Sequence, residues 1–181
     1  MALVKFTAVV PPLIVMGVTG CGKTAVGTLL ARKLSARFIE GDRLHPEANV
    51  AKMASGIPLD DEDRASWLDT IGGAIADEVR AGELVVATCS SLKRIYRDRL
   101  RSFAPDLVFV HLVLSREESW RRVSSRPGHF MPASLVDSQF ATLELPAADE
   151  ASITMDATLP LDQIVYELAS NFTPLSSCPQ A

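Results

Sequence analysis

The sequence predicts a three-layer α/β/α fold, with a central parallel sheet of about five strands covered by helices on both faces. Short apolar runs alternate along the chain with longer stretches in which apolar residues recur at helical spacing. Hydrophobic residues make up 48% of the chain and aromatic residues 6%, a balance that favours an α/β fold. Strands that alternate with helices imply right-handed βαβ units. The 181 residues suit one domain.

The N-terminal half is expected to supply two strands and three helices. The strands are predicted at residues 13–15 and 37–40, and a helix with an apolar face follows the first strand at residues 23–34. A short helix starts at Pro46 and stops before Gly56. A longer helix runs from a cap at Asp60 or Asp61 to Gly82.

The C-terminal half is expected to alternate in the same way. Strands are predicted at residues 84–88, 107–114 and 152–155. Residues 84–88, "LVVAT", form a continuous apolar run typical of a central parallel strand. The intervening helices are predicted at residues 92–103, 116–125, 132–140 and 161–168, and residues 173–181 read as a loose tail.

A phosphate-binding pattern lies between the first strand and the first helix. The stretch "MGVTGCGKTAVG" fits G-x-x-x-x-G-K-[ST] at Gly17, Gly22, Lys23 and Thr24. Glycines let backbone N–H groups point inward, and the helix start adds its positive dipole end. Lys23 would neutralise the β- and γ-phosphates, and Thr24 would offer its hydroxyl to Mg²⁺. The alternative is a tight turn that binds nothing.

Polar residues follow other predicted strands and should meet the phosphate turn, because ligands sit at the carboxyl ends of parallel strands. Asp42 follows the second strand, where it would accept the proton of a substrate hydroxyl or hold Mg²⁺ through water. Its alternative role is that of an ordinary turn aspartate. Ser90 and Ser91 follow the third strand and would either bind a ligand or cap the next helix.

Basic side chains recur in two later helices. In "CSSLKRIYRDRLR", Lys93 and Arg97 are four residues apart and nearest the strand end, where they would grip a carboxylate or a phosphoryl group; Arg101 is interpreted as a solvated residue. In "RRVSSRPGHF", Arg126 precedes Pro127 and Gly128, so it would either fold over ATP from a hinged loop or lie on the surface.

Two histidines leave less specific signals. His129 would contact the substrate or pack beside Phe130. His111 lies within an apolar strand pattern and is interpreted as structural.

Composition excludes several classes of function. A net charge of −4 gives no general attraction for nucleic acid. The three cysteines lack CxxC spacing, which argues against a disulfide scaffold or zinc. The apolar run at residues 8–18 is interrupted by Pro11 and Pro12, and no other stretch approaches membrane-spanning length. A cytoplasmic protein without nucleic-acid or membrane partners is therefore expected.

Over residues 13–172 the chain resembles the gluconate kinases of the P-loop, shikimate kinase-like group. The resemblance rests on "GVTGCGKT", "GDRLHPEANVAKMASGIPLDDEDRASWL", "CSSLKRIYRDRLR" and "RPGHFMPASLVDSQFATLELP", in that order. It implies ATP-dependent phosphorylation of the terminal hydroxyl of D-gluconate, with Mg²⁺, in carbohydrate acid catabolism. It also implies a homodimer. The segment at about residues 43–82 would bind substrate, and a lid would span about residues 122–135.

The resemblance also implies which residues form each part of the site. The phosphate and nucleotide side would comprise Gly17, Val18, Thr19, Gly20, Cys21, Gly22, Lys23, Thr24, Arg122, Gln139 and Pro146. The substrate side would comprise Asp42, His45, Arg64, Lys93, Arg97 and His129. Lys23, Asp42 and Arg126 would be catalytic, and Thr24 and Asp42 would hold the metal.

Two alternative functions predict different motifs. A shikimate kinase would resemble a pattern with a glycine triplet after the third strand, where this chain reads "CSSLKR". A guanine-nucleotide switch would carry an N-K-x-D motif, which the sequence lacks. The D-x-x-G match at residues 69–72 lies inside a predicted helix rather than after a strand, so it is discounted.

Overall fold

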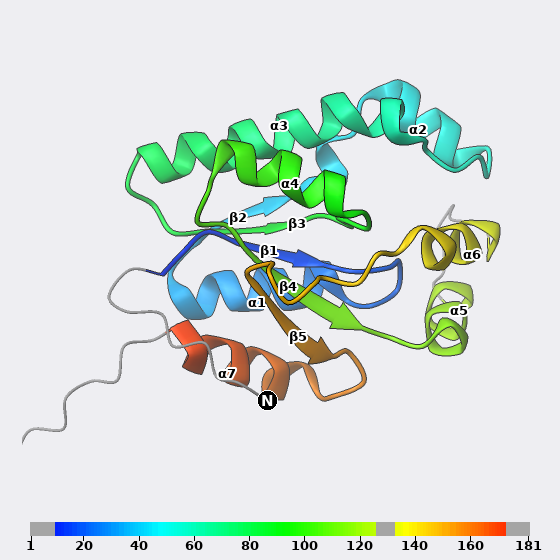
Figure 1. Ribbon diagram of the computed structural model, residues 1–181. Coiled ribbons are helices and arrows are strands. Elements are labelled where there is room, and N and C mark those ends of the chain that lie inside the picture. Colours follow the sequence, from blue (N-terminus) through cyan, green and yellow to red (C-terminus); the bar gives the residue numbers. More distant parts are fainter. Residues whose placement is uncertain (1–9, 126–132, 173–181) are drawn as a thin grey trace, which may run out of the picture.

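A computed structural model describes residues 10–125 and 133–172. Its centre is a five-stranded parallel sheet in the order β2-β3-β1-β4-β5 (Figure 1). The strands are β1 (Leu13–Met16), β2 (Arg37–Glu40), β3 (Val85–Thr88), β4 (Val108–Val113) and β5 (Ser152–Asp156). In the register, Ile14 of β1 lies level with Ala87 of β3 and Phe109 of β4. The predicted parallel α/β sheet is confirmed.

Two helical layers cover the sheet because its strands are apolar on both faces. Helices α3 (Asp61–Arg80) and α4 (Arg94–Phe103) lie on one face, and α1 (Lys23–Leu34) and α7 (Leu161–Phe172) lie on the other (Figure 1). Ile14 and Met16 of β1 pack in the α3–α4 core, whereas Leu13 and Val15 pack in the α1–α7 core. This alternation follows from the two-residue period of a strand.

The remaining helical elements gather where the strands end. The short 3₁₀ turn η1 (Gly41–Leu44) and α2 (Glu47–Ala54) precede α3, and α5 (Arg116–Ser124) and α6 (Ala133–Thr142) lie beyond the carboxyl end of β4 (Figure 1). The segment between α5 and α6, residues 126–132, lies outside the described residues. So does the predicted tail at residues 173–181.

Local sequence accounts for two boundaries that position the site. The side chain of Asp60 accepts a hydrogen bond from the N–H of Asp63 at 2.9 Å, and the Asp63 side chain accepts one from the N–H of Asp60 at 2.9 Å. This capping box starts α3 at the predicted place and is worth about 1 kcal/mol. At Gly41 an added Cβ would lie 2.0 Å from the carbonyl oxygen of Thr88, so only glycine lets the turn before Asp42 approach β3 this closely.

The described helices do not include one that combines the length and the apolar composition needed to cross a membrane.

Candidate active site

The glycine-rich loop between β1 and α1 has the backbone geometry of a phosphate cradle. Gly17, Gly20 and Gly22 have φ angles of 138°, 77° and 96°, in the region that favours glycine. A Cβ at Gly17 would lie 2.8 Å from the carbonyl oxygen of Leu112, and one at Gly20 would lie 3.2 Å from that of Ser119. The loop is therefore curled tightly against β4 and α5, with the N-terminus of α1 at its end.

Lys23 lies across this loop. Its Nζ donates hydrogen bonds to the carbonyl oxygens of Gly17 and Val18, each at 3.1 Å. Thr24 is exposed beside it. A cavity of about 720 Å³ opens here, and its lining residues are Thr19, Gly20, Gly22, Lys23, Thr24, Ala25, Thr28, Leu29, Arg32, Glu40, Asp42 and Leu161. The phosphate loop and the predicted base thus share one cavity.

Helices α5 and α6 hold the loop from behind through Thr19. The Ser119 hydroxyl donates to the carbonyl oxygen of Thr19 at 2.8 Å, and the N–H of Thr19 donates to Oε1 of Gln139 at 2.7 Å. Within the loop, the side chains of Val18 and Cys21 are buried. Gln139, predicted to lie near the nucleotide, therefore contacts the phosphate loop directly.

Asp42 and Glu40 bring two carboxylates to the far side of the cavity. Asp42 is exposed on η1, and Glu40 is the last residue of β2. One carboxylate oxygen of Glu40 accepts a hydrogen bond from the hydroxyl of Thr88, while Oε2 is buried without a hydrogen-bond partner among the described residues. Sequence reasoning missed Glu40 as a site residue; its signal was an acidic side chain at a predicted strand's carboxyl end.

Arg64, predicted to bind the substrate, presents a buried guanidinium next to Ser90. The residue is 9% exposed, and its Nη1 and Nε lie 3.5 Å and 3.4 Å from Ser90 Oγ and the carbonyl oxygen of Leu59. These are long hydrogen bonds, and within residues 10–125 and 133–172 Arg64 forms no ion pair with a carboxylate. A buried charge so poorly satisfied suits an anionic ligand.

His45 is held against Trp67 near Asp42. The two rings stack at a centroid distance of 3.9 Å and an interplanar angle of 14°, and Trp67 Nε1 donates to the carbonyl oxygen of Gly41 at 2.8 Å. Burial lowers the pKa of His45 to about 4; Asp42 opposes this effect and Arg64 adds to it. His45 is therefore a neutral imidazole at pH 7.

Lys93 is paired with the first turn of α3. Its Nζ lies 2.6 Å and 2.9 Å from the two carboxylate oxygens of Asp61, which also accepts a hydrogen bond from the Tyr96 hydroxyl. Lys93 and then Tyr96 lower the pKa of Asp61 through these bonds. Lys93, predicted to bind the substrate, must therefore exchange Asp61 for any other anion.

Arg97 does not lie in the site, which contradicts the expectation drawn from helical spacing. It is fully buried, and its Nε and Nη2 donate to the carboxylate of Glu150 at 2.6 Å and 2.8 Å. Its Nη1 donates to three main-chain carbonyl oxygens, those of Ser91, Leu92 and Glu144. Each nitrogen of the Arg97 guanidinium is therefore already bonded within the protein, and Arg97 does not line the phosphate-loop cavity.

The remaining predicted site residues divide into three outcomes. Arg122 on α5 donates to Glu118 at 2.7 Å and to the carbonyl oxygen of Ala157, after β5, at 3.0 Å. Pro146 lies in the loop between α6 and β5 and does not belong to the described lining of the phosphate cavity. Arg126 and His129 lie outside the described residues.

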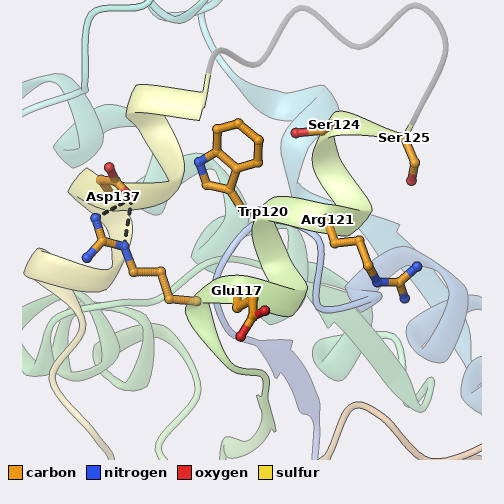
Figure 2. Close-up of a pocket in the computed structure, with 7 residues that line it drawn as sticks. Glu117, Trp120, Arg121, Ser124, Ser125 and Asp137 are labelled. Atoms are coloured by element: carbon orange, nitrogen blue, oxygen red, sulfur yellow. Dashed lines mark hydrogen bonds and ion pairs between the residues drawn. The ribbon is translucent and has the colours of Figure 1, made fainter.

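A second cavity, of about 880 Å³, opens between α5 and α6 (Figure 2). Trp120 projects into it, and Arg116 and Asp137, which form an ion pair, belong to its lining. None of the described candidate catalytic residues lines it. The smaller cavity at the phosphate loop, which combines a lysine, a threonine hydroxyl and two carboxylates, is therefore the candidate active site.

A divalent cation would find oxygen ligands in that cavity. The described residues contain no cluster of three His, Cys, Asp or Glu side chains arranged around a common point. The hydroxyl of Thr24 and the carboxylates of Asp42 and Glu40 belong to residues that line the cavity and form a sparse set of hard donors. Such a set fits Mg²⁺, which retains several waters and shares ligands with substrate phosphates.

Comparisons with known proteins agree with this geometry. The model of the shikimate kinase family matches residues 19–167. A gluconokinase of Gluconobacter oxydans (strain 621H) is 49% identical over 160 residues, covering 88% of this chain and 90% of that protein. The thermosensitive gluconokinase of Escherichia coli (strain K12) is 48% identical over 140 residues, covering 77% and 75%.

Two solved structures are similar throughout. The unliganded structure of a sugar kinase from Janibacter sp. HTCC2649 has a TM-score of 0.85 at 42% identity, covering 89% of this chain and 93% of that one. A gluconokinase structure from Sinorhizobium meliloti 1021 has a TM-score of 0.81 at 45% identity, covering 90% and 91%.

Proposed function

This chain belongs to the gluconokinase family, and we propose that it transfers the γ-phosphoryl group of ATP to the terminal hydroxyl of D-gluconate. The products are 6-phospho-D-gluconate and ADP. The observation that carries the proposal is a single cavity that joins the phosphate loop to Asp42 and Glu40. Arg64, a buried cation without a carboxylate partner in the described part of the chain, stands on the substrate side.

At the phosphate end, the main-chain N–H groups where the loop runs into α1, from Gly22 to Thr24, bind the phosphate oxygens. Lys23 leaves the carbonyl oxygens of Gly17 and Val18 and turns its ammonium group to the β- and γ-phosphates. It exchanges two neutral acceptors for charged ones. The positive charge of Lys23 stabilises the charge that the transferring group carries.

At the acceptor end, the carboxylate of Asp42 accepts the proton of the gluconate terminal hydroxyl as that oxygen attacks phosphorus. Asp42 is exposed to the cavity and stands on a turn whose position is fixed by the close contact of Gly41 with Thr88. General base catalysis of this kind contributes about 10²- to 10⁴-fold.

The carboxylate of gluconate is bound by Arg64, because an arginine fork matches a carboxylate in both charge and geometry. Ser90 and the neutral ring of His45 offer hydrogen bonds to the polyol. Lys93 adds a second positive charge once Asp61 releases it. The segment at about residues 43–82, which holds α2 and α3, supplies the Arg64 and His45 side of this substrate site.

Mg²⁺ would be held by the hydroxyl of Thr24, with Asp42 and Glu40 as carboxylate ligands directly or through water. When bound, it neutralises phosphate charge during transfer.

Arg126, with His129 near the substrate, is proposed to cover the nucleotide from the lid at about residues 122–135, and Arg122 and Pro146 to contact it at its periphery. The family resemblance supports these assignments. It also supports a cytoplasmic homodimer, with no nucleic-acid or membrane partner, as a further proposal. Sedimentation equilibrium at micromolar concentration tests the homodimer.

A coupled assay of ADP release tests the reaction. Gluconate, shikimate and no acceptor are compared at saturating ATP and Mg²⁺. Turnover that depends on gluconate supports the proposal. Turnover without an acceptor, or with shikimate alone, contradicts it.

A further inference from the structure

We propose that Arg97 and Glu150 form a positioning pair that sets the backbone of residues 89–93 and thereby places Ser90 and Lys93 for the acceptor. This inference rests on the proposed function. Residues 89–93 connect β3 to α4 and are named here the acceptor loop.

The pair is buried and geometrically specific. Each side chain is 1% exposed, and the guanidinium of Arg97 binds both carboxylate oxygens of Glu150. Arg101 donates a further hydrogen bond to Glu150 at 3.1 Å, and so does the N–H of Ala147 at 2.9 Å. A bidentate arginine–carboxylate pair with additional donors fixes the orientation of both side chains as well as balancing their charges.

The third nitrogen of Arg97 links two loops. Its Nη1 donates to Ser91 and Leu92 in the acceptor loop at 3.1 Å and 3.3 Å, and to Glu144, between α6 and β5, at 3.0 Å. The N–H of Glu144 donates back to the carbonyl oxygen of Leu92 at 2.8 Å. The carboxylate of Glu144 accepts the N–H of Arg94 at 2.6 Å, at the start of α4.

The other side of the acceptor loop faces the active site. The carbonyl oxygen of Ser90 accepts the N–H of Gly17 at 3.3 Å, and the Ser90 hydroxyl accepts from Arg64. Between these contacts Ser91, a non-glycine residue, has a φ of 45° and is fully buried. Surrounding contacts must maintain such a backbone conformation, and Arg97 supplies two of them.

A purely structural role makes a different prediction. Damage to a buried ion pair lowers stability and would affect both substrates together. Positioning acts mainly on the acceptor, because the phosphate loop, which meets the acceptor loop at the Gly17–Ser90 hydrogen bond, is also held at Thr19 by Ser119 and Gln139. The KM for gluconate should therefore change while the KM for ATP does not.

The test uses Arg97→Lys and Glu150→Asp, which keep both charges while altering the geometry of the pair. Each variant should raise the KM for gluconate, and the Kd for gluconate measured by calorimetry, by about tenfold, since small misplacements have large effects in active sites. The KM for ATP should stay within about twofold. Thermal unfolding reports the fold of each variant.

Two controls separate positioning from stability. Arg99→Lys repeats the substitution two residues along α4, where Arg99 binds Asp69 at 2.6 Å through two nitrogens, and should leave both KM values unchanged. Ile75→Ala removes core packing on α3 and should lower the Tm without a selective change in the gluconate KM.

Three outcomes overturn the inference. They are equal changes in both KM values, an unchanged gluconate KM in Arg97→Lys, or a gluconate-selective defect in Ile75→Ala. The wild-type chain tests the proposed function separately: absence of gluconate-dependent ADP release there contradicts the reaction itself.

Discussion

Gln139 accepts a hydrogen bond from the main-chain N–H of Thr19, 120 positions earlier in the chain, at 2.7 Å. The carbonyl oxygen of the same Thr19 is held by Ser119. Both backbone groups of one phosphate-loop residue are thus fixed by side chains from helices that flank residues 126–132. The loop conformation depends on α5 and α6 as well as on its own glycines.

Replacing Gln139 tests this dependence. Gln139→Ala frees the N–H of Thr19, and the loss of one hydrogen bond, about 1 kcal/mol, should raise the KM for ATP by about fivefold. The gluconate KM should stay close to that of the wild type. Ser138→Ala is the matched control, because the Ser138 hydroxyl donates to the carbonyl oxygen of Leu135 within its own helix. An unchanged ATP KM in Gln139→Ala would refute the support role.

Asp42→Asn tests the general base. The amide retains the shape of the side chain but cannot accept the proton, so kcat should fall by about 10²-fold or more. The Tm should barely change, because Asp42 is exposed. Arg43→Gln, the neighbouring exposed position on η1, serves as a control that should keep its turnover. Nearly full kcat in Asp42→Asn would exclude the base role.

Arg64→Lys tests recognition of the substrate carboxylate. Lysine keeps the charge but loses the fork, so the KM for gluconate should rise by about tenfold or more while kcat changes less. Initial rates over a gluconate series at saturating ATP measure the effect. A fall in kcat alone, with an unaltered gluconate KM, would place the carboxylate elsewhere.

The dependence of the rate on Mg²⁺ should change when Glu40 is replaced. Chelation with EDTA should abolish turnover and Mg²⁺ should restore it. In Glu40→Gln the Mg²⁺ concentration that gives half-maximal rate should rise about tenfold or more, the effect typical of losing one group that supports a metal site. Glu47→Gln, at an exposed position at the start of α2, is the matched control substitution. An identical Mg²⁺ dependence in Glu40→Gln would remove Glu40 from the metal site.

Stability should fall as pH decreases through the range set by His45. Its pKa in the folded protein, about 4, lies below its ordinary value of 6.5, so the unfolded chain binds more protons between these values. Unfolding free energy therefore decreases from pH 6.5 downward. His45→Phe keeps an aromatic ring over Trp67 but removes the titrating imidazole. The Tm of this variant should therefore depend less on pH between pH 6.5 and 5.

Other groups limit where this effect can be measured. The pKa of His111 is also lowered, mainly by burial and in addition by the charge of Arg97. The Tm of His45→Phe should therefore still depend on pH to some extent. Below about pH 4.5 the loss of stability comes mainly from carboxylates such as Glu150, whose pKa is lowered to about 2 chiefly by Arg97. An equal slope of Tm against pH in the wild type and His45→Phe between pH 6.5 and 5 would contradict the assignment of this effect to His45.

The sequence patterns predicted the helices and strands well because each pattern spans only a few neighbouring residues. The Asp60 cap, the apolar face of α3 and the glycine pattern at residues 17–24 each depend on residues a few positions apart. Their spacing therefore sufficed to place α3, the phosphate loop and Asp42 at one end of the sheet.

Long-range pairing was beyond those patterns. Arg97 shares a helical face with Lys93, yet its partner Glu150 lies 53 positions away, and nothing in the spacing of α4 reveals it. Glu40 was missed because its neighbour Asp42 accounted for the acidic signal; only the fold shows that both carboxylates reach the same cavity.

The stack of His45 on Trp67 gives the molecule a built-in optical probe. The chain has two tryptophans: Trp67, 1% exposed, stacks on His45 of the proposed acceptor side, whereas Trp120, 47% exposed, belongs to α5 and lines the second cavity. Acrylamide should quench the emission of Trp120 and spare that of Trp67. Fluorescence recorded with the quencher present would then follow the acceptor side in real time, without a label.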